Sequence, residues 1–296
     1  MTIAILTGGT SSEREVALQS AASVKQAISD RAEVTTLDIP KDLNMFLAER
    51  GKFDCVIPVF HGRGGEDGTI QGFLETLGMP YIFSRVGGHA LAIDKPRVNL
   101  VIGAAGIAVP HGELVQEGTK LKFTKPVVIK PVDGGSSIGI TIAHNQAELE
   151  TGVMAARKQS SAVMVEEYIE GQEFSVAVID LEGKSIALPV ISIKPKHEFF
   201  DYQSKYETGL AEETCPADIP PDLASRLQSA ALTVHKTIGA RHVTRTDFIV
   251  DQQEKIWFLD VNTIPGMVVL LPMPIRASGR DFGDVLMSWV MSVIST

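Results

Sequence analysis

Two apolar runs near the C-terminal end of the chain present oxygen-bearing side chains, and this pair constrains the fold most. Asp247 opens a run that ends at Asp251, and Asp260 and Asn262 close a run that begins at Phe258. Asp260 and Asn262 are two positions apart, so on a strand both side chains point to one face. Carboxylate and amide oxygens are hard ligands that suit Mg²⁺, which proteins usually hold together with substrate phosphates. The sequence therefore predicts two strands that carry a magnesium site formed by Asp247, Asp260 and Asn262.

A nucleotide site of this kind also needs a phosphate-binding segment, and residues 130–139 are the candidate. Their glycines let successive backbone N–H groups converge on an anion, and Ser136 and Ser137 add hydroxyl donors. The segment is not a Walker motif, because no Gly-Lys-Ser/Thr ends it and a strand follows it. Lys130 ends an apolar strand just before the turn, and Lys95 offers a second ammonium group. The alternatives are a plain glycine-rich hairpin turn and, for Lys95, a solvated surface charge.

Three further features are candidate parts of the same site. Residues 166–173 follow a predicted strand, and their backbone and Glu173 could contact an adenosine; an acidic solvated linker is the alternative. Arg245 shares a face with Asp247 if the segment is extended, where a guanidinium suits a transferring phosphoryl group or a developing oxyanion. A structural salt bridge is the alternative for Arg245. His61 precedes a glycine-rich loop and could reach a ligand.

The first part of the chain alternates between strands and helices. Strands are predicted at 3–6, 34–38 and 53–60, with a helix after Gly8-Gly9 whose start carries a Ser12–Glu15 capping box. Such alternation predicts an α/β domain with a parallel sheet and helices on both faces, in which ligands lie beyond the carboxyl ends of the strands.

Three domains are expected from the change of pattern along the chain. They are an α/β domain at 1–88, a small α+β unit with antiparallel strands at 89–170, and a mixed unit at 171–296 that contains the predicted metal site. The polar segment 194–220 shows no clear period and is predicted to be a functional loop.

Composition excludes several function classes. The chain has 296 residues with 44% hydrophobic and 21% charged residues, close to an ordinary globular protein. A net charge of −9 argues against nonspecific nucleic-acid binding, and no apolar run approaches the roughly 18 residues needed to span a membrane. Cys55 and Cys215 form neither a metal spacing nor a disulfide framework. We expect a cytoplasmic enzyme without nucleic-acid or membrane partners.

Taken in order, the motifs resemble those of the D-alanine–D-alanine ligases of the ATP-grasp superfamily. The resemblance covers essentially the whole chain, and several independent motifs occur in the same order. They are residues 8–16, 61–68, Asp94-Lys95, Lys130-Pro131 with 135–139, 199–206 and 260–267.

The resemblance implies an ATP-grasp fold that follows an N-terminal parallel-sheet domain, with ATP held between the central and C-terminal units. It also implies a reaction in two steps: ATP phosphorylates the carboxylate of one D-alanine, and the amine of a second D-alanine attacks the acylphosphate. Expected cofactors are ATP and Mg²⁺, with two ions and with Mn²⁺ as a substitute, and the family suggests a homodimer.

Residue roles are carried over by position from the same resemblance. Glu13, linked to Ser136 and Tyr206, would orient the ammonium of the first substrate, and His61 would lie beside its carboxylate. Arg245 and the N–H of Gly266 would form the oxyanion hole, and the metal ligands would again be Asp247, Asp260 and Asn262. The residues expected to bind ATP are Lys95, Lys130, Ser137, Glu166, Glu167, Ile169, Glu173 and Lys205.

The chain departs from the family pattern in three places. The segment after Met267 is short and has no hydroxyl, so that Leu270 and Leu271 stand where a Ser-Leu pair usually receives the second substrate. Residues 82–85 replace a Thr-Gly-Ser-Gly, and Asp260 replaces a glutamate.

These departures leave two alternatives to a ligase that makes D-alanyl-D-alanine. One is a related carboxylate–amine ligase that uses a different second substrate. The other is a nucleotide-binding regulatory protein without turnover.

Overall fold

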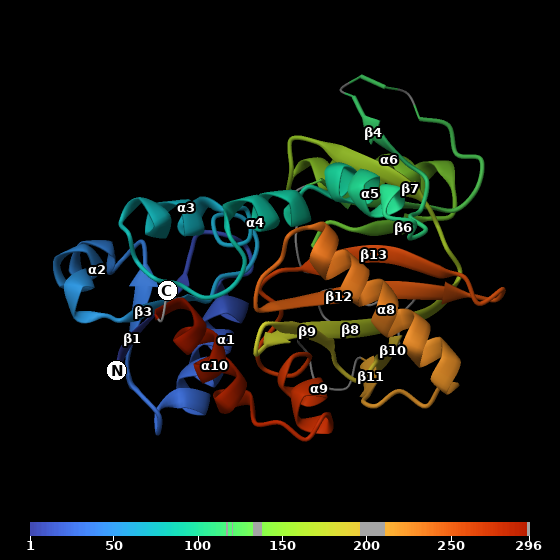
Figure 1. Ribbon diagram of the computed structural model, residues 1–296. Helices are drawn as coiled ribbons and strands as arrows, with labels where there is room; N and C mark the ends of the chain where they lie inside the picture. Colours follow the sequence, from blue (N-terminus) through green and yellow to red (C-terminus); the bar gives the residue numbers. More distant parts are fainter. Residues whose placement is uncertain (117, 120, 133–137, 196–210, 295–296) are drawn as a thin grey trace.

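The described part of the chain forms three β-sheets that lie side by side with helices around them (Figure 1). The structure, a computed structural model, describes residues 1–116, 118–119, 121–132, 138–195 and 211–294. The predicted residues Ser136, Ser137, Lys205 and Tyr206 lie outside these ranges. Each of the three sheets falls within one of the three predicted ranges, 1–88, 89–170 and 171–296. The exact domain boundaries stay a prediction.

The N-terminal sheet has the predicted parallel arrangement. Its strand order is β2-β1-β3, formed by β1 (Thr2–Gly8), β2 (Glu33–Ile39) and β3 (Cys55–Pro58). Apolar side chains of α1 (Arg14–Ile28) pack on one face. Those of α2 (Leu43–Glu49) and α3 (Thr69–Thr76) pack on the other, and a 3₁₀ turn at Arg50–Lys52 precedes β3. The expectation of helices on both faces is therefore confirmed.

The predicted capping box at the start of α1 is wrong. The helix begins at Arg14, and the N-cap position is occupied by Glu13, whose side chain makes no capping hydrogen bond. The Ser11 hydroxyl accepts the Glu13 N–H at 3.2 Å and donates to the His61 carbonyl at 2.7 Å. A long-range contact with the 61–68 loop thus takes the place of the local capping pattern.

The central unit is built on an antiparallel sheet with the order β4-β7-β5-β6. Two helices lead into it, α4 (Val86–Ile93) and α5 (Lys95–Ala104), and Asp94 caps α5 through the Arg97 N–H. The remaining elements are β4 (Gly112–Val115), β5 (Val127–Pro131), β6 (Thr141–Ala143), α6 (Gln146–Arg157) and β7 (Val163–Glu167). The strands that were predicted to flank the glycine-rich turn are β5 and β6.

The C-terminal sheet has the order β11-β10-β8-β12-β13, with β9 paired to β8. Helix α8 (Pro221–Thr237) packs against β8, β9 and β12. The strands are β8 (Gly171–Leu181), β9 (Lys184–Ala187), β10 (Ile191–Pro195), β11 (Ala211–Thr214), β12 (Val243–Asp251) and β13 (Ile256–Asn262). Strand β11 lies in the segment that was predicted to be a loop, because an edge strand of this length has no detectable period.

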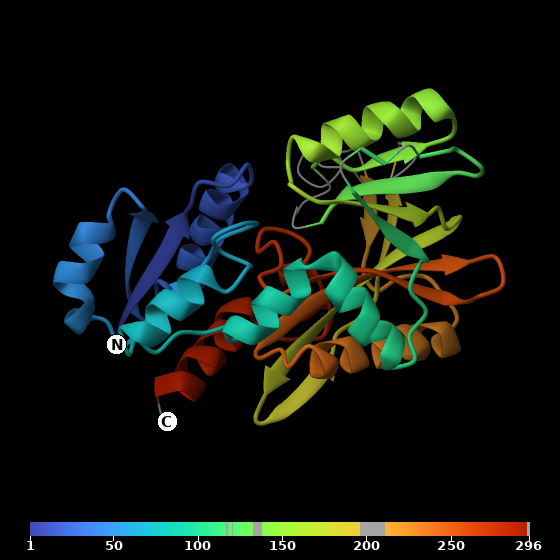
Figure 2. The same cartoon turned by 90° about the horizontal axis from the view of Figure 1, so that it is seen from above.

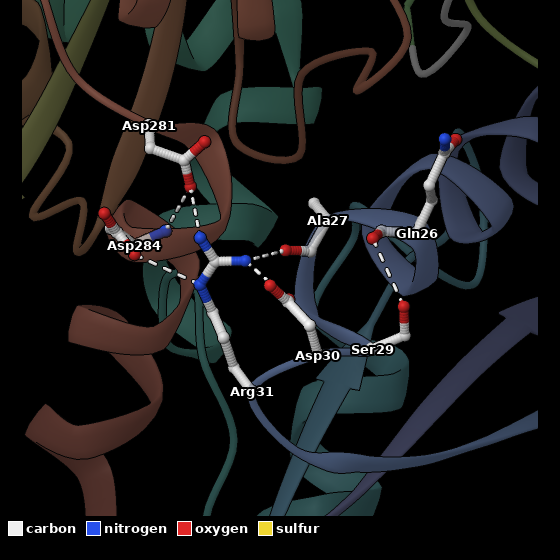
Figure 3. A network of polar contacts seen from close by, with 7 residues as sticks. All are labelled: Gln26, Ala27, Ser29, Asp30, Arg31, Asp281 and Asp284. Carbon is white, nitrogen blue, oxygen red and sulfur yellow. Dashed lines mark hydrogen bonds and ion pairs between the residues drawn. The ribbon is translucent and has the colours of Figure 1, made fainter.

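The last helix of the chain returns to the first domain (Figures 1 and 2). After α9 (Pro272–Ala277), helix α10 (Phe282–Ile294) packs against α1 and completes the core over β1. At its start, Arg31 forms ion pairs with Asp281 at 2.9 Å and Asp284 at 3.1 Å, and also contacts Asp30 (Figure 3). The N-terminal and C-terminal units are therefore joined by both apolar and ionic contacts.

In the part of the chain that the structure covers, none of the helices has the length and apolar character required to traverse a bilayer.

Candidate active site

Loops beyond the carboxyl ends of β1 and β3 bring Glu13 and the 61–68 loop together. The side chain of Glu13 is buried, and its Oε2 lies so close to Gly62 that a Cβ there would be 2.3 Å away. Gly62 also has φ +70°, a left-handed conformation that other residues rarely adopt. Glycine is therefore required at this position so that the loop can pass over Glu13.

Glu66 is a site residue that sequence reasoning missed, although it lies in the quoted motif 61–68. Its carboxylate accepts the N–H of Gly62 at 2.9 Å and the N–H of Ile264 at 3.3 Å. Burial, assisted by the nearby charges of Glu13 and Asp260, raises the pKa of Glu66 to about 8. A carboxyl group that retains a proton near neutral pH therefore links the N-terminal loop to the loop after β13.

His61 is buried and lies in a chain of hydrogen bonds. Its Nε2 is 3.0 Å from the Ser20 hydroxyl on α1. Burial, together with the charge of Arg245, lowers the pKa of His61 to about 4, although a hydrogen bond with the Ile264 backbone opposes this shift. The imidazole is therefore neutral at physiological pH, so that it can act as a hydrogen-bonding group beside a substrate carboxylate but not as a cation.

The predicted strands that carry the metal ligands are β12 and β13, which pair in antiparallel fashion. Asp247 lies opposite Asp260, next to a bulge, and Arg245 lies opposite Asn262. Arg245 shares a face with Asp247 and binds it through Nε at 3.0 Å and through Nη2 at 2.8 Å. The prediction that Arg245 and Asp247 share one face of the strand is thus confirmed, and Arg245 is ion-paired in this structure. Ser175 on β8 also donates to Asp247, at 2.6 Å.

A pocket joins residues from all three units. Lys95 at the start of α5, Glu66 from the N-terminal loop, and Asp260 and Asn262 from β13 line it together. Lys95 is buried, so its ammonium group is held in the protein interior and is not a solvated surface charge. The structure therefore brings together a lysine predicted to bind phosphate and two of the predicted metal ligands.

The donor set at this pocket fits Mg²⁺ by its chemistry. Asp260 and Asn262 line the pocket and supply a carboxylate and an amide oxygen. Asp247 lies opposite Asp260 on the adjacent strand, where its carboxylate accepts from Arg245 and Ser175. No group of three or more His, Cys, Asp or Glu side chains among the described residues could hold a metal by itself. A magnesium ion here would therefore depend on the amide, on water and on substrate phosphates to complete its shell, as is usual for Mg²⁺.

Lys130 and Glu166 face each other across β5 and β7. Their side chains form a buried ion pair at 2.5 Å, and Asn99 of α5 donates to the same carboxylate at 2.9 Å. Glu167 points to the opposite face of β7, where it binds the Lys125 ammonium and the His111 N–H, each at 3.0 Å. Of the two neighbouring glutamates, only Glu166 thus extends its side chain toward the predicted phosphate-binding lysine.

The remaining predicted residues lie around these groups. Glu173 lies on β8 opposite Ile249 and beside Ile193 of β10, and Ile169 is partly exposed just after β7. After Gly266, Leu270 packs on Ile191 and Ile193, and Leu271 is fully buried in the core. Val268 and Val269, 50% and 40% exposed, are the side chains of this segment that solvent or a ligand can reach.

Four further residues contact the predicted site and were not singled out from the sequence: Ser20, Ser23, Asn99 and Ser175. Ser20 had a detectable signal, because it is a polar residue between Val16, Ala17 and Val24 on the buried face of α1. The other three contact partners that are distant in the sequence, so that no local pattern identifies them.

Comparison with known proteins identifies the family. The model of the D-ala D-ala ligase N-terminus matches residues 44–84, and that of the D-ala D-ala ligase C-terminus matches residues 107–291. The chain is similar to a D-alanine–D-alanine ligase of Desulfotalea psychrophila, with 40% identity over 96% of this chain and 92% of that protein.

Two solved structures have the same fold over almost their whole length. The D-alanine–D-alanine ligase of Bacillus anthracis complexed with ATP has a TM-score of 0.84 and 28% identity, covering 100% of this chain and 97% of that chain. The VanG D-Ala:D-Ser ligase of Enterococcus faecalis has a TM-score of 0.82 and 30% identity, covering 99% of each chain. The chain belongs to the D-alanine–D-alanine ligase family.

Proposed function

We propose that the protein is an ATP-dependent ligase that joins two D-alanine molecules into D-alanyl-D-alanine for peptidoglycan synthesis. One observation carries the proposal: the pocket in which Lys95 meets Asp260 and Asn262, beside the Arg245–Asp247 pair. This arrangement supplies cationic and metal-binding groups to a nucleotide at the place where all three units meet. The names of the relatives support D-alanine as the substrate.

The first step of the proposed reaction transfers the γ-phosphoryl group of ATP to a carboxylate oxygen of the first D-alanine, with ADP as the leaving group. Such a transfer needs positioning and charge neutralisation more than covalent catalysis. Lys95 and Lys130 would neutralise phosphate oxygens, and Lys205 is proposed to do the same. Mg²⁺ held by Asp247, Asp260 and Asn262 would neutralise the charge that develops on the transferring group.

Further residues would bind the nucleotide. Ser137 is proposed to contact the phosphates, and Glu166, Glu167, Ile169 and Glu173 are proposed to line the adenosine. Because the carboxylate of Glu167 is already held by Lys125 and the His111 N–H, its proposed contribution is through the backbone.

In the second step the amine of the acceptor attacks the acyl carbon, phosphate leaves, and the amine loses a proton. Arg245 and the N–H of Gly266 would stabilise the oxyanion of the tetrahedral intermediate. Arg245 is held in place by Asp247 at its Nε and Nη2. Glu13, with Ser136 and Tyr206, is proposed to orient the ammonium of the first D-alanine, and neutral His61 to hydrogen-bond its carboxylate.

A related ligase with another acceptor is the second candidate. The exposed side chains after Met267 are Val268 and Val269, and this segment offers no hydroxyl to an acceptor carboxylate. A family relative is named as a D-Ala:D-Ser ligase, so that acceptor choice varies on this fold. Leu270 and Leu271 would then shape the acceptor site by packing beneath these valines.

A substrate panel tests the proposal. The purified protein is incubated with Mg²⁺-ATP and with D-alanine alone, D-alanine plus D-serine, D-alanine plus D-lactate, or L-alanine. ADP release and product mass are then measured. We expect release with D-alanine alone and a product with the mass of D-alanyl-D-alanine. Release only when a second kind of acceptor is present would refute the main proposal in favour of the second candidate.

The R245K variant separates an enzyme from a regulatory nucleotide-binding protein. Lysine retains the positive charge beside Asp247 but loses the two-pronged geometry, so that we expect ATP binding to persist and product formation to fall about 100-fold. If the wild type and R245K bind ATP equally well and neither forms product, a nucleotide-binding regulatory protein is favoured instead. A homodimer and a cytoplasmic location complete the proposal.

A further inference from the structure

We infer that Ser20 and Ser23 of helix α1 are positioning residues that hold the loop carrying Gly266, and thereby set the direction of the Gly266 N–H. The inference rests on the proposed function, because it gives these serines a role at the proposed oxyanion hole. Neither serine would touch the substrate, and both would act through Met267.

The two serines bind both polar groups of the Met267 backbone. The Ser23 hydroxyl donates to the Met267 carbonyl at 2.6 Å, and the Met267 N–H donates to the Ser20 hydroxyl at 3.4 Å. Residues three apart on a helix are neighbours on one face. A single face of α1 therefore fixes the two peptide planes that follow Gly266.

Ser20 links the Met267 backbone to His61. Its oxygen accepts the Met267 N–H, and its hydroxyl also lies 3.0 Å from the Nε2 atom of His61. The lowered pKa of His61 makes the imidazole neutral, so that one ring nitrogen is left to accept a hydrogen bond. Ser11 donates to the His61 carbonyl at 2.7 Å and so holds the backbone of that residue as well.

Glu66 supplies the third attachment of the same loop. Its carboxylate accepts the Ile264 N–H at 3.3 Å and the Gly62 N–H at 2.9 Å. The segment from Ile264 to Met267 is thus held at both ends by groups from the N-terminal domain. Gly266 lies inside this segment.

Gly266 itself provides little to fix its own position. It has no side chain, and a Cβ built on it would meet no atom of the described residues within 4 Å. Glycine also has more backbone freedom than any other residue. The direction of its N–H must therefore come from its neighbours, and among the described residues the contacts of Met267 with Ser20 and Ser23 hold the backbone directly after it. Catalytic donors need placement to within about 0.5 Å, and an error of about 1 Å can cost about 100-fold in rate.

Ser23 gives the cleaner test, because it is only partly buried and the described residues show it in one hydrogen bond. In S23A we expect kcat for ligation to fall about tenfold or more, with the KM for ATP unchanged. In S23T, which retains the hydroxyl, we expect kcat within about threefold of the wild type. The control is S29A on the exposed C-terminal end of the same helix, which should leave both constants unchanged (Figure 3).

Hydrogen exchange gives a readout that needs no turnover. In S23A and in S20A we expect faster exchange in peptides covering 264–271, and unchanged exchange in β1 at the centre of the N-terminal sheet. S20A also provides a second variant if S23A folds poorly.

Two kinetic results would overturn the inference: a kcat for S23A within twofold of the wild type, or an equal loss of kcat in S23A and S23T. Unchanged exchange at 264–271 in both alanine variants would do the same. If the wild-type protein makes no product from any acceptor, the proposed function fails, while the exchange measurement still decides whether the serines hold the loop.

Discussion

Replacing Glu66 by glutamine removes a titrating group from the centre of the proposed site and changes its shape very little. The pKa of Glu66 is raised to about 8 from its usual 4.5 by burial and by the charges of Glu13 and Asp260. Between these two pKa values the folded protein retains a proton that the unfolded chain has released. Because the folded state binds more protons, the free energy of unfolding must fall as the pH rises through this window.

Glu66 can change the number of bound protons by at most one, and this sets the upper limit of the pH dependence of stability. A full difference of one bound proton changes the free energy of unfolding by about 1.4 kcal/mol per pH unit. Glu66 interacts with Glu13, so the proton belongs to the pair and the slope is spread over a wider pH range. We therefore expect the wild type to lose stability relative to E66Q by up to about 1.4 kcal/mol per pH unit between pH 5 and pH 8.

Denaturant unfolding at several pH values measures this difference. Wild type and E66Q are unfolded at pH 5, 6, 7 and 8, and the difference in free energy of unfolding is plotted against pH. The control E33Q removes an exposed carboxylate of the N-terminal domain and should give a flat plot. A flat plot for E66Q, or one in which the wild type gains stability as the pH rises, would refute the assignment of a protonated carboxyl at position 66.

Three further predictions concern the phosphate, loop and metal positions. K130M leaves the buried Glu166 carboxylate without its cation. We therefore expect the free energy of unfolding, measured with denaturant, to fall by about 3–5 kcal/mol and ATP binding to weaken. The double variant K130M/E166Q should recover most of the stability. G62A forces a left-handed alanine against Glu13, and should cost about 1–2 kcal/mol or more and raise the KM for D-alanine. D260A should raise the Mg²⁺ concentration for half-maximal turnover several-fold with little change in thermal stability, since Asp260 lines the pocket; an unchanged Mg²⁺ requirement would exclude it as a ligand.

Periodicity and turn chemistry predicted most of the framework. The parallel sheet, the strands on either side of the glycine-rich turn and the shared face of Arg245 and Asp247 all follow from spacings within a few residues. They could be predicted because the interactions that form them are local, or repeat at the period of a strand or helix.

Contacts between distant segments could not be predicted in this way. Strand β11 exists because β10 offers it a partner, and not because of its own pattern. The Ser11 hydroxyl donates to the distant His61 carbonyl, and the capping box expected at Ser12–Glu15 does not form. The Ser23–Met267 hydrogen bond joins two ends of the chain. The raised pKa of Glu66 comes first from its burial and then from the charges of Glu13 and Asp260, which lie far from it in sequence.

The packing of helix α10 on the first domain has a consequence for biosynthesis. The core over β1 includes Ile3 and Ile5 from the start of the chain and Leu286 and Trp289 from its last helix. On a ribosome that adds roughly 5–20 residues per second, the first strand waits roughly 15–60 s for the helix that covers it. During this interval the nascent chain presents an uncovered apolar surface, which is a natural binding site for chaperones. The core of the N-terminal domain is therefore completed only after helix α10 has been synthesised.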